Sequence, residues 1–373
     1  MEKVEASSKT EDKPKSRKPS EALWRQQKMS ACKPIWSGAV LGVLFTIAGI
    51  VFVIVGGFLL GIVRDVKEYE LDYTRCATTN NRSESSINQS TCADYLLNTS
   101  SSDRLHLRRD ACQCNRTFVL QENFTGPVYV YYFLTEFFQN HRRYVKSRDD
   151  DQLMGDPTVT NGNCDPFEDG DVGDGLLPYA PCGMIANSLF NDSFNIALSD
   201  GSDVSWTRTG IAWPSDYKGK FKNPEPSSTI EELKKHFVNV TLPPPSWPVP
   251  VWGLSNDVSN TGFINEDLIV WMRTAAFPRF RKLYAKIEGG LQAGVPYTVK
   301  INYNFPVTVF DGTKSLVFST TSSIGGRRFF VPIIYLVVGG LLLLFAITFF
   351  LIYYFVEPKR DKKNWKRVRE FKQ

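Results

Sequence analysis

Two long runs of apolar residues, at 39–63 and 329–356, stand near the ends of this 373-residue chain. Neither run contains a charged residue, and no other stretch of the sequence is apolar over a comparable length. At about 1.5 Å of rise per residue, a helix of about 20 residues crosses a hydrocarbon core about 30 Å thick. Because a helix satisfies its own backbone hydrogen bonds in lipid, each run predicts a transmembrane helix, the first of them an uncleaved signal anchor.

The first run carries glycine at a regular spacing. Gly42, Gly49 and Gly56 recur every seven residues, which is nearly two helical turns, so they form one stripe along one side of the helix. One interpretation is compositional, since glycine is commoner in membrane helices than in soluble ones. The other is a packing face shaped to receive a second helix at close range.

Between the two runs the pattern changes to short segments typical of strands. Residues 297–305 alternate without a break between large apolar or aromatic residues and Thr, Lys or Asn. This period of two predicts a strand of an antiparallel sheet with one solvated side. Further strands are predicted at 128–133, 204–209, 307–309 and 315–320, and residues 183–198 predict a short helix followed by a strand.

The clearest helical pattern of the middle segment is at 265–287. Asn265 can cap its start, the acidic Glu266 and Asp267 suit the positive end of the helix dipole, and Pro278 divides it into two short helices. The predicted fold is therefore two transmembrane helices flanking a mainly-β ectodomain, an antiparallel β-sandwich with inserted loops and short helices.

Charge predicts the orientation in the membrane. Residues 1–34 hold nine Lys or Arg against five acids, residues 357–373 hold eight against three, and the middle segment is left at −4. Basic flanks stay on the cytosolic side, which predicts a cytosolic tail at 1–34, transmembrane helices at 35–63 and 329–356, a luminal or extracellular domain at 64–328 and a basic cytosolic tail at 357–373. The expected partner of the tails is the anionic surface of membrane lipids, not nucleic acid.

Glycosylation sequons and cysteines support the same orientation. The pattern Asn-x-Ser/Thr is absent from both tails and occurs at Asn81, Asn88, Asn98, Asn115, Asn123, Asn191 and Asn239. Six of the seven cysteines lie in the same segment, at Cys76, Cys92, Cys112, Cys114, Cys164 and Cys182, which predicts three disulfides in an oxidising compartment. Cys164 and Cys182 bracket an acidic loop and would tie its base, whereas Cys32 is expected to be a reduced thiol at the cytosolic membrane edge.

Candidate chemistry is sparse. The chain has only three histidines and lacks the serine-hydrolase, zinc-protease, P-loop and dinucleotide motifs. The acidic runs 149–151 and 165–174 lack the alternating ligands of a calcium loop, and the Cys-x-Cys pair at 112–114 lacks the paired histidines of a zinc site. We interpret Arg142, Arg143 and Arg148 as paired with these acids or with the loops of a partner. The sequence thus predicts a binding or structural protein without a cofactor, a metal or catalysis.

Several long motifs in one order resemble a known family. They are Asn140 to Tyr144, Pro181 to Gly183, Gly210 to Trp213, Gly262 to Asp267, Trp271 to Ala275, Phe280 to Tyr284 and Tyr303 to Val307. Between two spans, this order resembles the cell cycle control protein 50 family, the accessory β subunits of the type IV P-type ATPases, which are phospholipid flippases. The resemblance covers residues 30–355.

The resemblance implies a non-catalytic subunit that forms a heterodimer with a flippase, lets it leave the endoplasmic reticulum and supports its transport of aminophospholipids to the cytosolic leaflet. It implies residence in the endoplasmic reticulum, Golgi, secretory and endosomal membranes and plasma membrane. The alternative is a two-span ion-channel subunit with a large ectodomain, but such a subunit would be expected to line a pore with a polar stripe, and here the stripe is glycine.

The resemblance also implies residue roles. It suggests a nested pairing of Cys76 with Cys114 and Cys92 with Cys112, although these first two cysteines stand farther apart than is usual in the family, and Cys164 with Cys182 as the third bridge. The ectodomain is expected to cap the luminal loops of the ATPase. Gly42, Gly49 and Gly56 would receive either the second span, near Gly339 and Ala346, or a helix of the ATPase.

Overall fold

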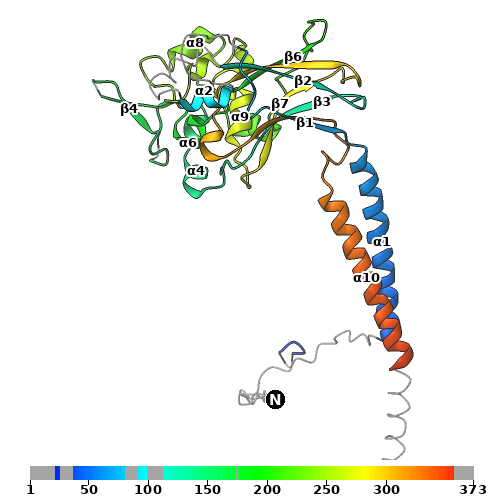
Figure 1. Ribbon diagram of the computed structural model, residues 1–373. Helices are drawn as coiled ribbons and strands as arrows, with labels where there is room; N and C mark the ends of the chain where they lie inside the picture. Colours follow the sequence, from blue (N-terminus) through cyan, green and yellow to red (C-terminus); the bar gives the residue numbers. More distant parts are fainter. Residues whose placement is uncertain are drawn as a thin grey trace, which may run out of the picture. The chain divides into compact units, whose positions relative to one another are not determined.

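The two apolar runs form the two longest helices. In the computed structural model, which describes residues 22–25, 37–79, 91–98, 112–160, 162–173 and 175–356, α1 spans Gly38–Arg64 and α10 spans Phe330–Phe355. Both helices are long and apolar enough to cross a membrane. They lie side by side as a hairpin (Figure 1), and the part of the chain between them folds as a separate unit, called here the middle domain.

The middle domain contains short elements only. Its strands are β1 Glu68–Asp72, β2 Cys112–Val119, β3 Val128–Leu134, β4 Asp169–Asp171, β5 Leu176–Pro178, β6 Ser193–Leu198, β7 Phe280–Ile287, β8 Pro296–Tyr303 and β9 Lys314–Ser319. Its α-helices are α2 Cys92–Asn98, α4 Arg142–Lys146, α5 Asp150–Leu153, α6 Gly183–Asn187, α7 Pro214–Gly219, α8 Ile230–Lys235 and α9 Glu266–Met272. Its 3₁₀ turns are η1 Val251–Gly253, η2 Val258–Asn260, η3 Gly262–Ile264 and η4 Thr308–Phe310.

Two antiparallel sheets form the core of the middle domain. One has the strand order β1-β9-β3-β7 and the other β2-β8-β6, while β4 and β5 make a separate hairpin. Aromatic side chains join the two larger sheets: the ring of Phe118 on β2 stacks on Phe318 of β9 at 4.9 Å between centroids, and Phe194 on β6 meets Tyr284 of β7 at 5.0 Å. The expected antiparallel sandwich is therefore confirmed (Figure 1).

Alternation along the sequence located β8, whose two faces differ in burial. In β8, Tyr297, Val299, Ile301 and Tyr303 are buried and Lys300 between them is exposed, as the pattern predicts. The predicted strands at 128–133 and 315–320 correspond to β3 and β9, and the helix and strand predicted in 183–198 correspond to α6 and β6.

The long helical prediction at 265–287 is half right. Asn265 caps α9, its Oδ1 accepting a hydrogen bond from the backbone N–H of Leu268 at 3.0 Å, but the second half forms β7 instead of a helix. The helix prediction was wrong there because the polar Lys282 occupies a buried position in line with Phe280 and Tyr284, so the alternation of a strand was not visible in the sequence. Its ammonium finds buried carbonyl partners that a local pattern does not reveal.

Two predicted strands are absent from the described residues 204–209 and 307–309. In the first segment only Thr207 pairs with β7, exchanging backbone hydrogen bonds with Lys286, and the side chain of Arg208 pairs with Asp267 and lies over the ring of Tyr284. The second segment belongs to the 3₁₀ turn η4, which reverses the chain before β9. Gly312 is required after that turn, since a Cβ there would lie 2.7 Å from the carbonyl oxygen of Thr135.

Three disulfides close the middle domain. The structure joins Cys76 to Cys114, Cys92 to Cys112 and Cys164 to Cys182, which is the nested arrangement that the resemblance implies. The first two bridges attach β2 to the segment before it. Since loops of about 20 to 40 residues lose substantial unfolded-state entropy when closed, each bridge contributes about 3 kcal/mol.

A fully buried ion pair ties the ends of four strands together. Lys314, the first residue of β9, contacts Asp192 at 2.6 Å, and both side chains have 0% exposure. Asp192 also accepts hydrogen bonds from the hydroxyl of Tyr73 and from the backbone N–H groups of Asn304 and Phe305. The Lys314 ammonium further donates to the carbonyl of Phe305, so the buried charges are well satisfied.

Candidate functional site

The regularly spaced glycines of α1 form a buried line along that helix. Gly38, Gly42, Gly49 and Gly56 are buried, whereas apolar neighbours such as Val43 and Ile50 are exposed. The structure places this line against α10, so the second span occupies the face that the glycines create.

The approach of the two helices leaves no room for larger side chains. A Cβ atom at Gly42 would lie 2.9 Å from the ring of Phe350, one at Gly49 2.8 Å from Leu343 Cγ, and one at Gly56 3.0 Å from Leu336 Cγ. These separations are shorter than ordinary carbon contacts, so substitution requires the facing side chains or the helices themselves to shift.

Two of the residues of α10 that face the glycine line are also small. Gly339 and Ala346 of α10 are buried, and the Cβ positions of Gly49 and Gly339 each lie 3.1 Å from the other glycine's carbonyl oxygen. Such close backbone approach gives the dispersion contacts that hold helices together in lipid. In contrast, Gly57 and Gly61 of α1 have no atom within 4 Å of their Cβ positions.

The predicted contact arginines lie on or next to α4. Arg142 and Arg143 are exposed and form no ion pair with another described residue, whereas Arg148 Nε contacts Asp150 Oδ1 at 2.9 Å. One of the three therefore pairs internally as expected, and two are open to a partner.

The acidic runs have structural roles. Asp149 caps α5, its Oδ1 accepting a hydrogen bond from the backbone N–H of Gln152 at 2.9 Å. In the second run, Glu168 accepts the backbone N–H of Gly162 and Asp171 that of Gly173. These carboxylates bind backbone groups and, for Asp150, the neighbouring Arg148, and no acidic cluster that could hold a metal occurs among the described residues of the two runs.

The sequons differ in accessibility. Asn115, Asn123 and Asn239 are exposed, and Asn191 is half-buried. Asn98 is the last residue of α2, and its side chain is not among those described; Asn81 and Asn88 lie outside the described residues, as do most of the tail 1–34, including Cys32, and all of 357–373. Three acceptor sites are thus exposed in the folded middle domain.

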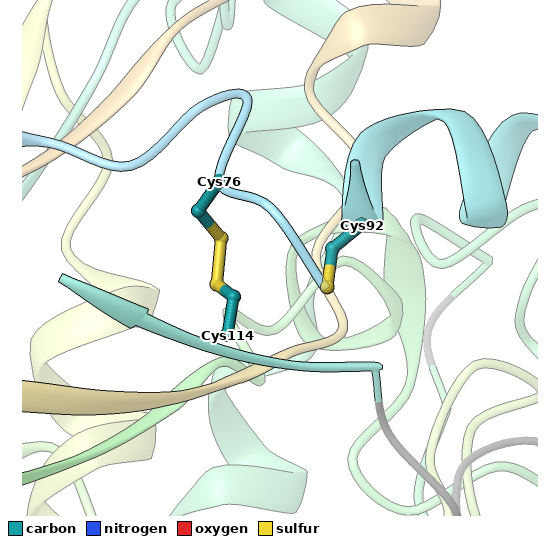
Figure 2. Close-up of side chains that lie close together, drawn as sticks. All are labelled: Cys76, Cys92 and Cys114. Carbon is teal, nitrogen blue, oxygen red and sulfur yellow. A yellow bond between two sulfur atoms is a disulfide. The ribbon is translucent and has the colours of Figure 1, made fainter. Parts of the chain in front are cut away.

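The described part of the chain places two of the three histidines and a cluster of cysteines. His141 is exposed, His236 Nε2 meets the carbonyl oxygen of Pro226 at 2.9 Å, and His106 lies outside the described residues. The sulfurs of Cys76, Cys92 and Cys114 lie within 4.8 Å of one another (Figure 2), but each belongs to a disulfide and is not the thiolate that zinc requires.

Two neighbouring cavities that the sequence did not indicate share Arg273 in their linings, and together we call them the Arg273 groove. One is larger and mainly apolar, with a volume of about 450 Å³, and the other is smaller and charged, with a volume of about 220 Å³. Both cavities share Asp216, Ile269, Arg273 and Thr274. Other lining residues are Tyr129, Tyr131, Ile211, Trp213, Arg281 and Leu283 in the apolar half and Arg148, Asp150 and Lys220 in the charged half.

Arg273 is fixed at the junction of the two halves. Its Nε and Nη2 each lie 2.7 Å from Asp216 Oδ2, and its guanidinium lies 4.9 Å from the ring centroid of Trp213. Burial opposes ionisation of Asp216, but the hydrogen bonds and charges of Lys220 and Arg273 outweigh it and lower the pKa of that carboxyl. The groove thus presents oriented charges next to an aromatic surface.

Glu266 holds one wall of the groove. Its carboxylate accepts backbone hydrogen bonds of 2.7 to 2.8 Å from Gly210, Ile211 and Ala212, which precede Trp213. An ionised acceptor makes stronger hydrogen bonds than a neutral one, so this side chain orders the loop. The motifs at 210–213 and 262–267, widely separated in sequence, meet through this contact.

Lys282 fixes the backbone at the end of α9, next to the groove. Its buried ammonium donates to the carbonyl oxygens of Val270, Trp271 and Arg273 at 3.1, 2.6 and 2.7 Å. Burial lowers the pKa of Lys282 well below its ordinary value. The three hydrogen bonds fix the C-terminal end of α9 and the backbone of Arg273, whose side chain lines the groove.

Replacing Glu266 by glutamine tests the wall directly. Because an amide has one carbonyl oxygen and no charge, at most part of the three backbone hydrogen bonds can survive, and we expect the free energy of unfolding to fall by about 1–3 kcal/mol. Limited proteolysis should cut the variant faster within 209–214 than wild type. Glu288→Gln on the exposed surface is the control, and equal cutting of all three proteins would contradict the role of Glu266.

The sequence is similar to known proteins over most of its length. The model of the LEM3 (ligand-effect modulator 3) family / CDC50 family matches residues 59–360. Human cell cycle control protein 50B is 42% identical over 321 residues, covering 83% of this chain and 86% of that protein. Bovine cell cycle control protein 50A is 38% identical, covering 84% and 82%, and ALA-interacting subunit 3 of Arabidopsis thaliana is 37% identical, covering 84% and 79%.

Proposed function

The chain belongs to the CDC50 family, and from this membership we propose that it is a non-catalytic accessory β subunit of a type IV P-type ATPase that moves phospholipids across a membrane. The observation that carries the proposal is the family match over residues 59–360, which includes all of the middle domain and the whole second helix. The name of the Arabidopsis relative, an interacting subunit, supports a role in a complex.

The finer parts of the function follow from the same proposal. The subunit lets its ATPase leave the endoplasmic reticulum, stabilises it and supports transport of aminophospholipids to the cytosolic leaflet. Both tails lie in the cytosol, the domain 64–328 lies in the lumen or outside the cell, and the complex passes through the Golgi and endosomal membranes to the plasma membrane. The basic tails contact anionic lipid headgroups there.

Arg142, Arg143 and Arg148 are proposed contacts to the luminal loops of the ATPase. The first two are exposed and have no ion pair with described residues, which suits a basic patch in a segment of net charge −4. The alternative of a channel subunit is less well supported, because α1 and α10 meet through glycine and apolar side chains.

Purification of the full-length chain in mild detergent tests this function. We expect a large P-type ATPase to co-purify at near-equal amount, identifiable by mass spectrometry. Recovery of a self-oligomer alone, without an ATPase, would contradict the proposal and favour the channel alternative.

Glycosylation tests the orientation of the middle domain. Asn115→Gln, Asn123→Gln and Asn239→Gln should each lose one glycan, seen as one step of increased mobility on a gel that enzymatic deglycosylation abolishes. Asn140→Gln, which alters no sequon, is the control. Unchanged mobility of all three variants would place this domain outside the secretory lumen.

A further inference from the structure

We propose that Arg64, Arg327 and Arg328, at the ends of the two spans that adjoin the middle domain, form with Asp65 a binding site for a phospholipid headgroup in the outer leaflet of the membrane. The headgroup carries a phosphate, a carboxylate and an ammonium, which is the chemistry of an anionic aminophospholipid. The inference rests on the proposed function for the orientation of the spans, and it gives this subunit a lipid site of its own.

The packing of the two helices brings the arginines to one level. The antiparallel register advances seven residues along α1 for seven residues back along α10, and it sets Gly56 against Leu336. Continued by eight residues, the same register places Arg64, the last residue of α1, level with Arg328, two residues before α10 begins. The end of one span and the start of the other therefore carry their charges side by side.

Contacts beyond the helices hold the same two segments together. The backbone N–H of Lys67 donates to Thr320 Oγ1 and the carbonyl oxygen of Lys67 accepts from the N–H of Thr320, both at 2.9 Å. Arg281 Nη1 contacts Glu68 Oε2 at 2.7 Å, and a Cβ atom at Gly326 would lie 2.7 Å from Arg281 Nη2. The residue before the two arginines is thus held next to the start of β1, which follows α1.

The charges of this cluster are open to a ligand. Arg64, Arg327 and Arg328 are exposed, and none of them forms an ion pair with another described residue. The guanidinium of Arg327 lies 5.4 Å from the ring centroid of Phe329, which restricts its orientation. Asp65 is exposed, and its carboxylate has no hydrogen bond or ion pair with the described residues. Three cations and one anion therefore stand without internal partners.

The position of the cluster calls for an individual anionic ligand. Lys and Arg normally flank spans on the cytosolic side, where the leaflet itself is anionic and attracts them. The outer leaflet lacks that general attraction, so a basic cluster at this end of the spans needs another source of negative charge. Exposed apolar side chains beside it, Ile324 at 56% and Phe330 at 72%, place the arginines where lipid headgroups meet the hydrocarbon.

The composition of the cluster selects the headgroup. Guanidinium groups bind phosphate and carboxylate through paired, charge-assisted hydrogen bonds, and the carboxylate of Asp65 accepts hydrogen bonds from a primary ammonium. The headgroup of phosphatidylserine offers all three groups. Phosphatidylglycerol has the same net charge without the carboxylate and the ammonium, and the quaternary ammonium of phosphatidylcholine has no N–H to donate. We therefore expect phosphatidylserine to be preferred over both.

Photo-crosslinking next to the cluster tests the site. Benzoylphenylalanine replaces Phe330 in the full-length chain, reconstituted in nanodiscs with equal amounts of the three lipids, and the captured lipid is identified by mass spectrometry. We expect phosphatidylserine to be captured at least about fivefold more than either of the others. Arg327→Gln with Arg328→Gln should abolish this preference, whereas Lys218→Gln with Lys235→Gln, at exposed positions of the middle domain, should keep it.

A second crosslinking position separates the cluster from the basic tails. Tyr354, near the other end of α10, has the same 72% exposure as Phe330, and capture of lipid there should not respond to substitution of Arg327 and Arg328. Equal capture of the three lipids at position 330 of the wild type would overturn the proposal. A preference at 330 that survives the loss of both arginines would also overturn it.

Asp65→Asn tests recognition of the ammonium apart from attraction by charge. The ratio of phosphatidylserine to phosphatidylglycerol captured at position 330 should fall at least about twofold, because the amide carries no charge to pair with the ammonium. An unchanged ratio would refute the role of Asp65. Co-purification of the ATPase is measured separately: its absence would refute the accessory function, whereas its presence without a lipid preference at position 330 would refute the lipid site alone.

Discussion

Replacing Lys314 by methionine is expected to lower the free energy of unfolding of the middle domain by about 3–5 kcal/mol. The methionine fills most of the volume but leaves the Asp192 carboxylate buried without its cation. Asp192 has 0% exposure, and its remaining partners, Tyr73 and two backbone N–H groups, are neutral donors. The ring of Tyr303, which lies 3.1 Å from the Lys314 ammonium, also loses a cation–π contact.

Thermal unfolding of the purified full-length protein measures this loss. The double variant Lys314→Met with Asp192→Asn should recover part of the stability, because it removes both charges at once. Lys300→Met, at an exposed position on β8, is the control for losing a lysine from a strand. If the single and double variants are equally unstable, the ion pair is not the cause.

The ion pair of Lys314 and Asp192 should make the free energy of unfolding depend on pH. Burial is the main cause that lowers the pKa of Lys314 to about 8 from its ordinary value of 10.5, against the opposing effect of Asp192. Between these values the unfolded chain binds the proton more tightly than the folded one, so the free energy of unfolding rises with pH, by about 2 kcal/mol between pH 8 and 10. Above pH 10 the trend reverses, because burial raises the pKa of Tyr73 well above its ordinary value of 10.0 and the unfolded tyrosine ionises first.

Chemical denaturation of wild type and Lys314→Met across pH 7 to 10 measures this difference. The gap between the two proteins should widen with pH up to 10, whereas the neighbouring Asp192, Tyr73 and Tyr303 are present in both. A constant gap would show that Lys314 keeps its ordinary pKa.

Placing leucine at both Gly49 and Gly56 should separate α1 from α10. The new Cβ atoms would lie 2.8 Å from Leu343 and 3.0 Å from Leu336, before the rest of each leucine is added. Overpacking of this kind costs about 1–3 kcal/mol per site, and in lipid there is no hydrophobic effect to offset it. We expect glycosylation to be retained and recovery of the ATPase to fall about tenfold.

A chemical crosslink between α1 and α10 tests whether the two leucines act by separating these helices. In a Cys32→Ser background, Phe45→Cys and Phe349→Cys replace two stacked rings whose centroids are 5.3 Å apart, and a short bismaleimide should join them in the parent protein. The crosslink should be lost with leucine at Gly49 and Gly56 but kept with leucine at Gly57 and Gly61, which meet no atom within 4 Å. A crosslink kept in both variants would mean that α1 and α10 stay in contact even with leucine at Gly49 and Gly56.

The sequence by itself determined the features that depend on local period and composition. Uncharged runs long enough for lipid identified α1 and α10, unbroken alternation identified β8, and a capping Asn265 located the start of α9. Each of these follows from residues close together in the chain, because helix and strand periods are local properties.

Only the tertiary structure decided where polar groups turn inward and which surfaces meet. The polar Lys282 hid the alternation that would identify β7 as a strand. It can be buried because its ammonium donates to three backbone carbonyls up to 12 residues away, which no local pattern records. Glu266 orders one wall of the groove by accepting hydrogen bonds from a loop more than 50 residues earlier. The glycine stripe left open which helix would fill it, and α10, almost 300 residues on, does so. Such contacts depend on long-range packing and buried hydrogen bonds, which no period along the chain records.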